Sequence, residues 1–313
     1  MTFDQAFPLQ PEKSIDVLLV GELLIDFISD HDTGNLQQFF GGSPANIALN
    51  LHQLGLKSRM FTAIGKDGNG RFLLNFIREN KLSFHIDFVD YPTSYVEIDQ
   101  TASSPVPSFH RSSDKYIPLS NELKEDISKS QILHFSYWPL SDSPSYETIL
   151  ESILIAKENN ILIGFDPNYH PLLDDSNQTG LNRLKQIIKS VDIIKPSLDD
   201  SVRIFGDNHS IEEYMQMYQN LGCKLVLMTL GKKGIIAKYG NESIVLPSLA
   251  KKVIDSTGAG DSFWSGLYGG ISKGMSIYDS IQLGLLCSSF TLKVVGANAN
   301  LPKLDHLILS KEG

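Results

Sequence analysis

Short, continuous apolar runs alternate along most of the chain with longer stretches in which apolar residues recur every three or four positions. The continuous runs are typical of strands buried on both faces, and they lie at residues 15–21, 58–65, 131–135, 161–167, 191–196 and 223–231. The periodic stretches predict amphipathic helices, and they lie at residues 41–55, 69–82, 145–160, 181–190 and 197–206. This alternation predicts an α/β protein, a three-layer α/β/α sandwich around a mostly parallel sheet.

Two regions break the alternation. Residues 84–118 hold short runs of β-branched and aromatic residues separated by proline and serine, which predicts short antiparallel strands outside the main sheet. With parts of residues 22–43 they would form a small β lid; the alternative is a long surface hairpin without a role. Residues 234–254 predict further antiparallel strands, and two closing helices are expected to begin near residues 258 and 276. Residues 1–313 are expected to form one domain, because no internal repeat divides them.

Charge and cysteine content narrow the range of partners. The net charge is −9, so we expect no general binding to nucleic acid or to anionic membranes. No apolar run approaches the roughly 20 residues of a membrane span, and residues 1–14 lack the pattern of a secretory signal, which predicts a cytoplasmic protein. Cys223 and Cys287 lie among apolar neighbours, so they are expected to be buried, inert thiols.

The string DSTGAGDSF, residues 255–263, is the strongest candidate for chemistry. Gly258, Ala259 and Gly260 are small enough for their backbone N–H groups to approach a ligand, and they stand where a helix begins. Unpaired donors and the positive end of the helix dipole then form an anion site. Asp261 follows in the first turn, where it could accept the proton of an attacking hydroxyl during phosphoryl transfer. The alternative is that Asp261 only complements the helix dipole.

The same string closely resembles the C-terminal signature of the ribokinase-like (PfkB) family of carbohydrate kinases, usually D-T-T/S-G-A-G-D-x-F. FFGGSPANIA, residues 39–48, resembles the N-terminal marker of that family, and here Ser43 is a candidate helix cap with Pro44 in the first turn. The resemblance covers nearly the whole chain. It implies an ATP-dependent kinase that phosphorylates a hydroxyl of a small sugar, with Asp261 as the base and Gly258, Ala259 and Gly260 as the anion hole.

The resemblance also assigns residues to the sugar. A carboxylate can accept two hydroxyl protons and an amide offers both a donor and acceptors, which suits such contacts. The implied sugar-binding residues are Asp26, Gly41, Gly42, Asn46, Arg111 and Asn168. For Asp26 the alternative is an ordinary turn residue, for Asn46 a residue on the solvent side of a helix, and for Arg111 an exposed arginine.

Nucleotide and ion sites follow from the same resemblance. The implied nucleotide-binding residues are Lys195, Thr229, Gly231, Gly234 and Asn298. Lys195 ends a predicted strand and could neutralise phosphate charge, although a solvated lysine is the alternative. ATP would come with Mg²⁺, near Asp200 through a water molecule, and with a monovalent cation such as K⁺ near Asp255 and Thr257.

Two departures from the family pattern bear on function. Ser197 and Asp200 stand where the family has N-x-x-E, which predicts an altered magnesium dependence. His170 replaces the arginine of D-P-N-x-R, which disfavours a keto-acid substrate because a neutral imidazole is a poor carboxylate clamp. Fructose is therefore the first expected substrate, ahead of ribose, a nucleoside or 2-keto-3-deoxygluconate. A non-catalytic sugar or nucleotide sensor is the alternative, and a homodimer through the lid is expected from the resemblance. A dinucleotide-binding oxidoreductase is excluded, because no G-x-G-x-x-G follows the first strand.

Overall fold

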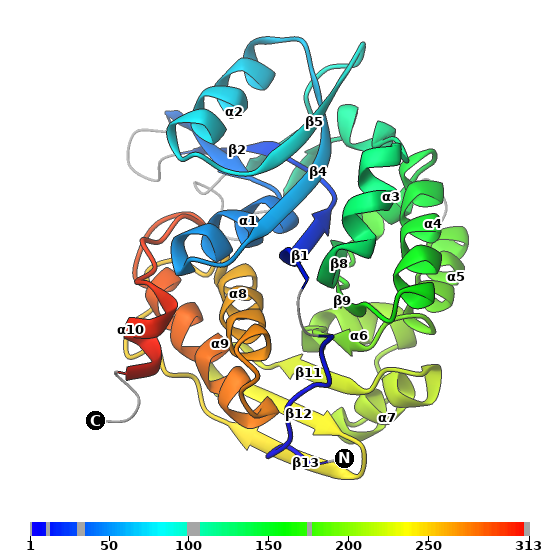
Figure 1. The fold of residues 1–313 in the computed structure, drawn as a ribbon, viewed down its shortest axis with the longest axis vertical. Helices are drawn as coiled ribbons and strands as arrows, with labels where there is room; N and C mark the ends of the chain where they lie inside the picture. Colours follow the sequence, from blue (N-terminus) through cyan, green and yellow to red (C-terminus); the bar gives the residue numbers. More distant parts are fainter. Residues whose placement is uncertain (1, 11–12, 30–34, 99–106, 174–176, 310–313) are drawn as a thin grey trace.

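The structure, a computed structural model, describes residues 2–10, 13–29, 35–98, 107–173 and 177–309. A nine-stranded sheet of described residues forms its centre, in the order β13-β12-β11-β10-β9-β8-β1-β4-β5 (Figure 1). These strands are β1 (Ile15–Val20), β4 (Ser58–Gly65), β5 (Phe84–Val89), β8 (Ser130–Ser136), β9 (Leu162–Asp166), β10 (Ile193–Ile194), β11 (Leu225–Thr229), β12 (Ile235–Tyr239) and β13 (Glu242–Leu246). Neighbouring strands are parallel except that β12 is antiparallel to both β11 and β13.

Strand β1 shows why the strands read as continuous apolar runs. Val17 and Leu19 belong to the hydrophobic core on one face of the sheet, whereas Leu18 and Val20 belong to the core on the other face. Side chains alternate between the two faces of a strand, so a sheet covered on both faces needs apolar residues at successive positions.

Helices cover both faces of this sheet (Figure 1). One face is covered by α1 (Ser43–Leu54), α2 (Gly68–Glu79), α8 (Ala259–Ser272), α9 (Ile277–Thr291) and α10 (Leu304–Leu309). The other face is covered by α3 (Asn121–Ser128), α4 (Ser145–Glu158), α5 (Asn177–Ile188), α6 (Leu198–Phe205) and α7 (Ile211–Leu221). The predicted three-layer α/β/α sandwich is confirmed.

A second sheet of four strands lies beside the first, in the order β3-β2-β6-β7. Its strands are β2 (Leu24–Ser29), β3 (Leu36–Gly41), β6 (Tyr95–Ile98) and β7 (Ser108–His110). One expectation was wrong: the run at 84–89 is β5, which pairs in parallel with β4 at the edge of the main sheet. Phe84 and Ile86 pack against the core there, which explains the apolar pattern. The parts of the predicted lid at residues 30–34 and 99–106 lie outside the described residues.

Several smaller features complete the fold. Cys223 and Cys287 are free and buried, as predicted. The late antiparallel strands end at Leu246, so residues 248–254 form no strand, contrary to the expectation for 234–254. Within the part of the chain that the structure describes, no helix is long and apolar enough to span a membrane.

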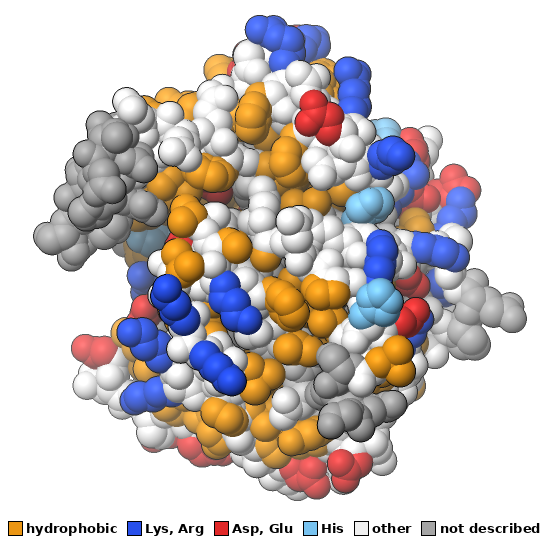
Figure 2. All heavy atoms as spheres, turned by 90° about the vertical axis from the view of Figure 1, so that its left-hand side faces the viewer, with side chains coloured by type: hydrophobic (Ala, Val, Ile, Leu, Met, Phe, Trp, Pro, Cys, Tyr) orange, Lys and Arg blue, Asp and Glu red, His pale blue; other side chains and the backbone are white. Residues whose placement is uncertain are grey.

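Although the net charge is negative, Lys and Arg side chains gather beside hydrophobic surface on the face shown in Figure 2.

Candidate active site

The candidate site lies where the parallel strands of the main sheet end. Glu22 follows β1, Asp166 ends β9, Lys195 follows β10 and Thr229 ends β11. The carboxyl ends of parallel strands lie at one edge of the sheet, which is where open α/β sheets bind ligands. The first turn of α8, with Asp261, lines a cavity at the same edge.

Three cavities meet at the beginning of α8. The α8–α9 cavity, about 370 Å³, is lined by Ala259, Gly260, Phe263 and Leu285 among others. The lid cavity, about 230 Å³, is lined by residues of the second sheet, among them Asp26, and by Glu22, Asn46, Trp138, Gly258 and Asp261. A connecting cavity, about 370 Å³, shares Lys195, Thr229 and Gly260 with the first and Phe109, Asn168 and His170 with the second. The N-terminus of α8 therefore opens into one continuous cleft.

Glycine is required at the start of α8. Gly258 caps the helix at φ 72°, and a Cβ there would overlap with Ala297. A Cβ at Gly260 would lie 3.1 Å from Nζ of Lys195, so the ammonium group reaches the first turn of the helix. The N–H of Ala259 donates to the carbonyl of Ser256 at 3.3 Å. Because the glycines carry no side chain, both the ammonium group of Lys195 and the cleft reach the backbone at the N-terminus of α8.

Asp261 lies in the first turn of α8, as the sequence predicts. Its side chain is buried and lines the lid cavity. Its Oδ1 accepts a hydrogen bond from Oγ of Ser43 at 2.7 Å, and its Oδ2 accepts one from Nδ2 of Asn46 at 2.9 Å. Burial raises the pKa of Asp261 to about 6, although these two hydrogen bonds oppose the shift. A carboxylate with a pKa near neutrality is suited to accept a proton.

Asp26 lines the same cavity from β2. Burial, and then the charge of Asp261, raises the pKa of Asp26 to about 7. A Cβ at Gly41 would overlap with Oδ2 of Asp26, so glycine at this position leaves room for the carboxylate. Gly42 has φ 103°, and a Cβ there would overlap with the carbonyl oxygen of Glu22. The structure therefore brings Asp26, Gly41, Gly42, Asn46 and Asp261 together.

Glu22 is a site residue that the sequence reasoning missed. Its side chain is only 3% exposed and lines the lid cavity. Oε1 accepts the backbone N–H of Ser43 at 3.1 Å and Oε2 accepts Oγ of Ser136 at 2.7 Å. Burial raises the pKa of Glu22 to about 8. The signal was present in the string VGELLIDF, where a second acid precedes Asp26 directly after an apolar strand.

Lys195 is buried rather than solvated. Its Nζ lies 2.8 Å from Oδ2 of Asp166, which also accepts Nε1 of Trp264 at 2.8 Å. Lys195 lines both the α8–α9 cavity and the connecting cavity. Asp166 was not predicted as a site residue, although it ends a predicted strand in the DPNYH string.

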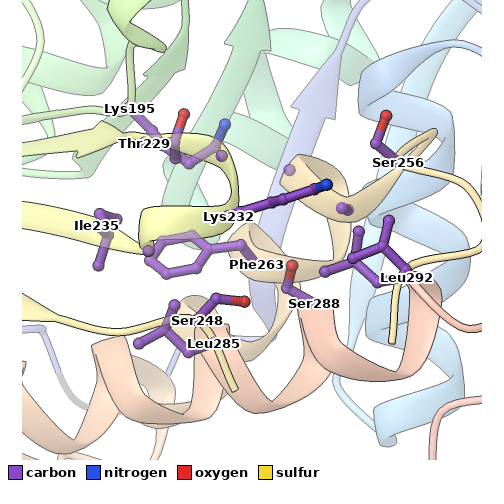
Figure 3. Close-up of a pocket in the computed structure, with 15 residues that line it drawn as sticks. Lys195, Thr229, Lys232, Ile235, Ser248, Ser256, Phe263, Leu285, Ser288 and Leu292 are labelled. Atoms are coloured by element: carbon purple, nitrogen blue, oxygen red, sulfur yellow. The ribbon is translucent and has the colours of Figure 1, made fainter. Parts of the chain in front are cut away.

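The α8–α9 cavity combines an apolar wall with a polar end (Figure 3). Thr229, Gly231 and Gly234, which the family resemblance assigns to the nucleotide, line it. Ile235, Phe263, Leu285 and Leu292 supply apolar surface, whereas Lys195, Thr229 and Ser256 supply polar groups, and Lys232 reaches across the cavity (Figure 3). Such a cavity is suited to a flat ring with a charged tail.

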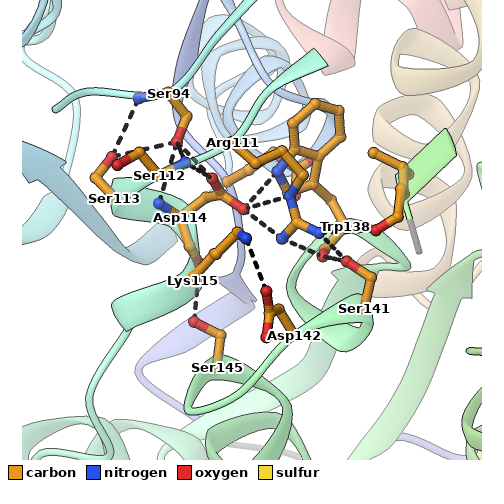
Figure 4. A network of polar contacts seen from close by, with 12 residues as sticks. Ser94, Arg111, Ser112, Ser113, Asp114, Lys115, Trp138, Ser141, Asp142 and Ser145 are labelled. Carbon is orange, nitrogen blue, oxygen red and sulfur yellow. Dashed lines mark hydrogen bonds and ion pairs between the residues drawn. The ribbon is translucent and has the colours of Figure 1, made fainter. Parts of the chain in front are cut away.

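Arg111 does not face the sugar cavity, contrary to the prediction. Its side chain is 8% exposed and its guanidinium binds Oδ2 of the fully buried Asp114 (Figure 4). The remaining donors bind Oγ of Ser141 and the carbonyls of Trp138 and Leu173. Because all five guanidinium donors are engaged within the chain, Arg111 is a structural residue here. Asp114 also accepts Nε1 of Trp138, which lines the lid cavity.

Two other predicted residues have different surroundings from those expected. Ser43 does not cap α1: Gly42 is the cap, no side chain caps the helix, and Ser43 binds Asp261 instead. Asn298 does not line the α8–α9 cavity. Its Oδ1 is buried and has no hydrogen-bond partner.

Asp200 is buried, and its side chain mainly caps the N-terminus of α6. Its Oδ2 accepts the N–H and the Oγ of Ser197 at 2.8 and 2.6 Å, which forms a capping box, and its Oδ1 accepts the N–H of Tyr169 at 2.9 Å. Asp200 lines the connecting cavity. Among the described residues, no group of three or more His, Cys, Asp or Glu side chains could hold a metal ion.

Asp255 and Thr257 lie directly before the N-terminus of α8. Oδ1 of Asp255 accepts both the N–H and the Oγ1 of Thr257, at 3.0 and 2.9 Å, and Oδ2 accepts the N–H of Gly296 at 2.9 Å. Burial opposes ionisation, but these hydrogen bonds keep the pKa of Asp255 below its usual value. Asp255 therefore ties the segment that holds Asn298 to the segment that begins α8.

Asn168 and His170 lie at the junction of the lid and connecting cavities. Asn168 has φ 36°, a conformation that is rare outside glycine and often marks a functional site. The ring of His170 packs against the ring of Phe109 at 5.2 Å. Burial, and then the charge of Arg203, lowers the pKa of His170, so this side chain contributes little positive charge near neutral pH.

Comparisons with known proteins find carbohydrate kinases. A family model described as pfkB family carbohydrate kinase matches residues 14–304. The chain is 43% identical over 302 residues to a protein of Thermoanaerobacterium thermosaccharolyticum named ATP-dependent 6-phosphofructokinase, covering 95% of this chain and 94% of that one. The fructokinase of Halothermothrix orenii superposes with a TM-score of 0.79 at 30% identity, covering 90% of this chain and 100% of that one. A fructokinase double mutant of Vibrio cholerae O395, solved with fructose, ADP and potassium ion bound, gives a TM-score of 0.83 at 27% identity, covering 96% and 99%.

Proposed function

The chain belongs to the PfkB family of carbohydrate kinases, and from this premise we propose that it transfers the γ-phosphate of ATP to a hydroxyl of fructose. The observation that carries the proposal is the position of Asp261, a buried carboxylate at the start of α8 where the cavities meet. ATP would occupy the α8–α9 cavity with its phosphates toward Lys195 and Gly260. The sugar would occupy the lid cavity, with its reacting hydroxyl beside Asp261.

The chemistry of the step needs few groups. Asp261 would accept the hydroxyl proton as the new phosphorus–oxygen bond forms and the bond to ADP breaks. The backbone N–H groups of Gly258 and Gly260 and the ammonium of Lys195 would hold the charge of the phosphoryl group in transit, whereas the N–H of Ala259, which the family resemblance also implies, already donates to Ser256. Asp26 and Asn46 would position the sugar hydroxyls.

The charge of the lid cavity supports an uncharged sugar. Its lining includes three carboxyl groups, from Glu22, Asp26 and Asp261, and no Lys or Arg among the described residues. Arg111, the arginine that the sequence placed there, is fully engaged elsewhere. A phosphate or carboxylate on the substrate would therefore lie beside the carboxylate of Asp261 without a compensating cation in this lining.

Fructose 6-phosphate is the second candidate. It is favoured by the relative that is 43% identical and carries the name ATP-dependent 6-phosphofructokinase. Its phosphate would need a cation that the described lining of one chain does not provide. Arg203, which lines the adjoining connecting cavity, or a second copy joined through the lid sheet in the homodimer that the family resemblance implies, would have to supply that cation.

Coupled measurement of ADP release separates these candidates. Purified protein with ATP, Mg²⁺ and K⁺ is given fructose, fructose 6-phosphate, ribose, a nucleoside or 2-keto-3-deoxygluconate at matched concentrations. We expect the highest kcat/KM with fructose. A higher value with fructose 6-phosphate would transfer the assignment to a phosphofructokinase, and ADP release that needs no sugar would remove the assignment of the lid cavity.

Ion requirements form a separate part of the proposal. Mg²⁺ would be held mostly by the ATP phosphates and water, with Asp200 acting through water because both its oxygens already accept hydrogen bonds. The residues that the resemblance assigns to K⁺ are linked through Asp255, which binds both Thr257 and Gly296. The unpartnered Oδ1 of Asn298, two residues after Gly296, is an oxygen that K⁺ could bind. We expect K⁺ to tighten ATP binding relative to choline in calorimetry, and Asp255→Asn to remove that difference.

A further inference from the structure

Ser43 stands at the first position of α1, and neither the motif nor the cavity assigns it a role of its own. We propose that Ser43 is a positioning residue that fixes the orientation of the Asp261 carboxylate, with Glu22 holding Ser43 in place. The inference rests on the proposed role of Asp261 as the base. It adds two residues to the machinery that prepares that base.

The hydroxyl of Ser43 is free for this contact. A serine at the start of a helix usually accepts a hydrogen bond from the backbone as its cap, but here Gly42 is the cap and no side chain caps α1. The hydroxyl instead donates to Oδ1 of Asp261 at 2.7 Å. This hydrogen bond connects α1 to α8, two helices that are far apart in the sequence but packed side by side.

Asp261 is held on both oxygens by one helix. Ser43 donates to Oδ1 and Asn46 donates to Oδ2 at 2.9 Å, and residues three apart share one face of a helix. A carboxylate has about four lone-pair sites, so two remain for a substrate hydroxyl. One donor on each oxygen fixes the plane of the carboxylate, which a single donor would leave free to rotate.

Glu22 supports Ser43 from the opposite side. Its Oε1 accepts the N–H of Ser43 at 3.1 Å while its Oε2 accepts Oγ of Ser136, at the end of β8, at 2.7 Å. The turn is tight enough that a Cβ at Gly42 would overlap with the carbonyl of Glu22. Glu22 therefore links the ends of β1 and β8 to the first residue of α1.

Loss of the Ser43 hydroxyl has a signature that a purely structural role would not produce. A hydrogen bond donated to a carboxylate favours its ionised form, and the Ser43 contact lowers the pKa of Asp261 against the effect of burial. The other charged groups around Asp261 are Asp26 on β2, Asp166 on β9, Lys195 after β10 and Glu22 after β1. None of these is changed in Ser43→Ala, so that variant isolates the hydroxyl.

The test is an NMR titration of protein labelled with ¹³C at the aspartate carboxyl carbons, with the Asp261 resonance identified by its loss in Asp261→Asn. Wild type is expected to titrate near pH 6. Ser43→Ala should raise that midpoint by about one pH unit, the size expected for one hydrogen bond to a charged group. The readout needs no sugar, so it remains decisive even if the proposed substrate is wrong.

Two matched variants complete the design. Ser262→Ala removes a neighbouring buried hydroxyl that binds Asn50 and Thr291, so the Asp261 midpoint should not move. Glu22→Leu removes the acceptor for the N–H of Ser43 and should raise the midpoint in the same direction as Ser43→Ala. Where sugar turnover is measurable, the acid limb of kcat/KM should shift upward in Ser43→Ala by the same amount. An unchanged Asp261 midpoint in Ser43→Ala, or an equal shift in Ser262→Ala, would overturn the proposal.

Discussion

The ammonium group of Lys195 lies 2.8 Å from Oδ2 of Asp166, and each side chain is less than one-tenth exposed. The pair ends two neighbouring strands, β9 and β10, and brings a single positive charge to the first turn of α8. Oδ1 of Asp166 is buried without a hydrogen-bond partner, so the carboxylate has few contacts besides Lys195 and Trp264.

Breaking this pair should destabilise the protein strongly. Asp166→Asn keeps the shape of the side chain but leaves Lys195 buried without its counter-charge. We expect a loss of about 3 kcal/mol in the free energy of unfolding, measured by denaturant titration. The double variant Asp166→Asn/Lys195→Met should be more stable than Asp166→Asn alone, because the unpaired charge is gone. A double variant as unstable as the sum of the single changes would contradict this account.

Replacing Asp261 should separate chemistry from binding. Asp261→Asn is expected to lower kcat by about 10²- to 10⁴-fold, the range for loss of a general base, while the Kd of ATP measured by calorimetry stays near the wild-type value. Near-normal kcat in this variant would remove the base assignment. Asp279→Asn, a change in the first turn of α9, serves as a control that alters a helix-terminal carboxylate away from the site.

The buried carboxyl group of Glu22 should make stability depend on pH. Its folded-state pKa is raised to about 8 by burial, so the folded protein binds a proton that the unfolded chain releases above its ordinary pKa. The stability linked to this group is therefore complete at pH below 4.5 and is lost as pH rises toward 8.

Glu22→Gln removes that ionisation. We expect the variant to gain free energy of unfolding relative to wild type as pH rises from 5 to 8, as measured by denaturant titration at several pH values. The matched control is Glu79→Gln, which changes an exposed glutamate at the end of α2. A difference between Glu22→Gln and wild type that is the same at every pH would show that Glu22 does not titrate in this range.

The Arg111–Asp114 pair should affect the sugar without affecting the nucleotide. Asp114 holds both Arg111 and Nε1 of Trp138, and Trp138 lines the lid cavity (Figure 4). Arg111→Lys cannot supply the five donors in a fixed plane, so the tryptophan should lose its fixed position. We expect the KM of the sugar to rise about tenfold, or about 1.4 kcal/mol, while the Kd of ATP does not change. Equal weakening of both ligands would indicate general loosening instead.

The sequence predicted the layers of the fold and the glycine-rich start of α8, because both depend on the local pattern of residue types. Buried parallel strands need continuous apolar runs, and a glycine-rich turn before a helix can be recognised from residue types alone. Helix α7 was missed although Ser210 and Glu213 form a capping box that marks its beginning. Strand β5 was placed in the wrong sheet because its pairing with β4 depends on tertiary contacts.

The errors at the site have a common origin. Arg111 was assigned to the sugar by family resemblance and Ser43 was expected to cap its helix, but their partners lie elsewhere in the chain: Trp138 and Ser141 for the arginine, Asp261 for the serine. A single sequence does not reveal which donors and acceptors will be neighbours. Glu22 illustrates the same point, since its role arises from contacts with Ser43 and Ser136 on two other elements.

The continuity of the cleft has a practical consequence for inhibition. Because the connecting cavity shares residues with both the α8–α9 cavity and the lid cavity, one molecule could occupy both ends at once. With ATP and fructose placed as proposed, an adenosine joined to a fructose by a short phosphate chain is expected to bind as a bisubstrate analogue. The second half would then bind at a high effective concentration once the first was in place. Such a compound is expected to distinguish this enzyme from other ATP-dependent enzymes through the lid cavity, whose described lining has three carboxyl groups and no Lys or Arg.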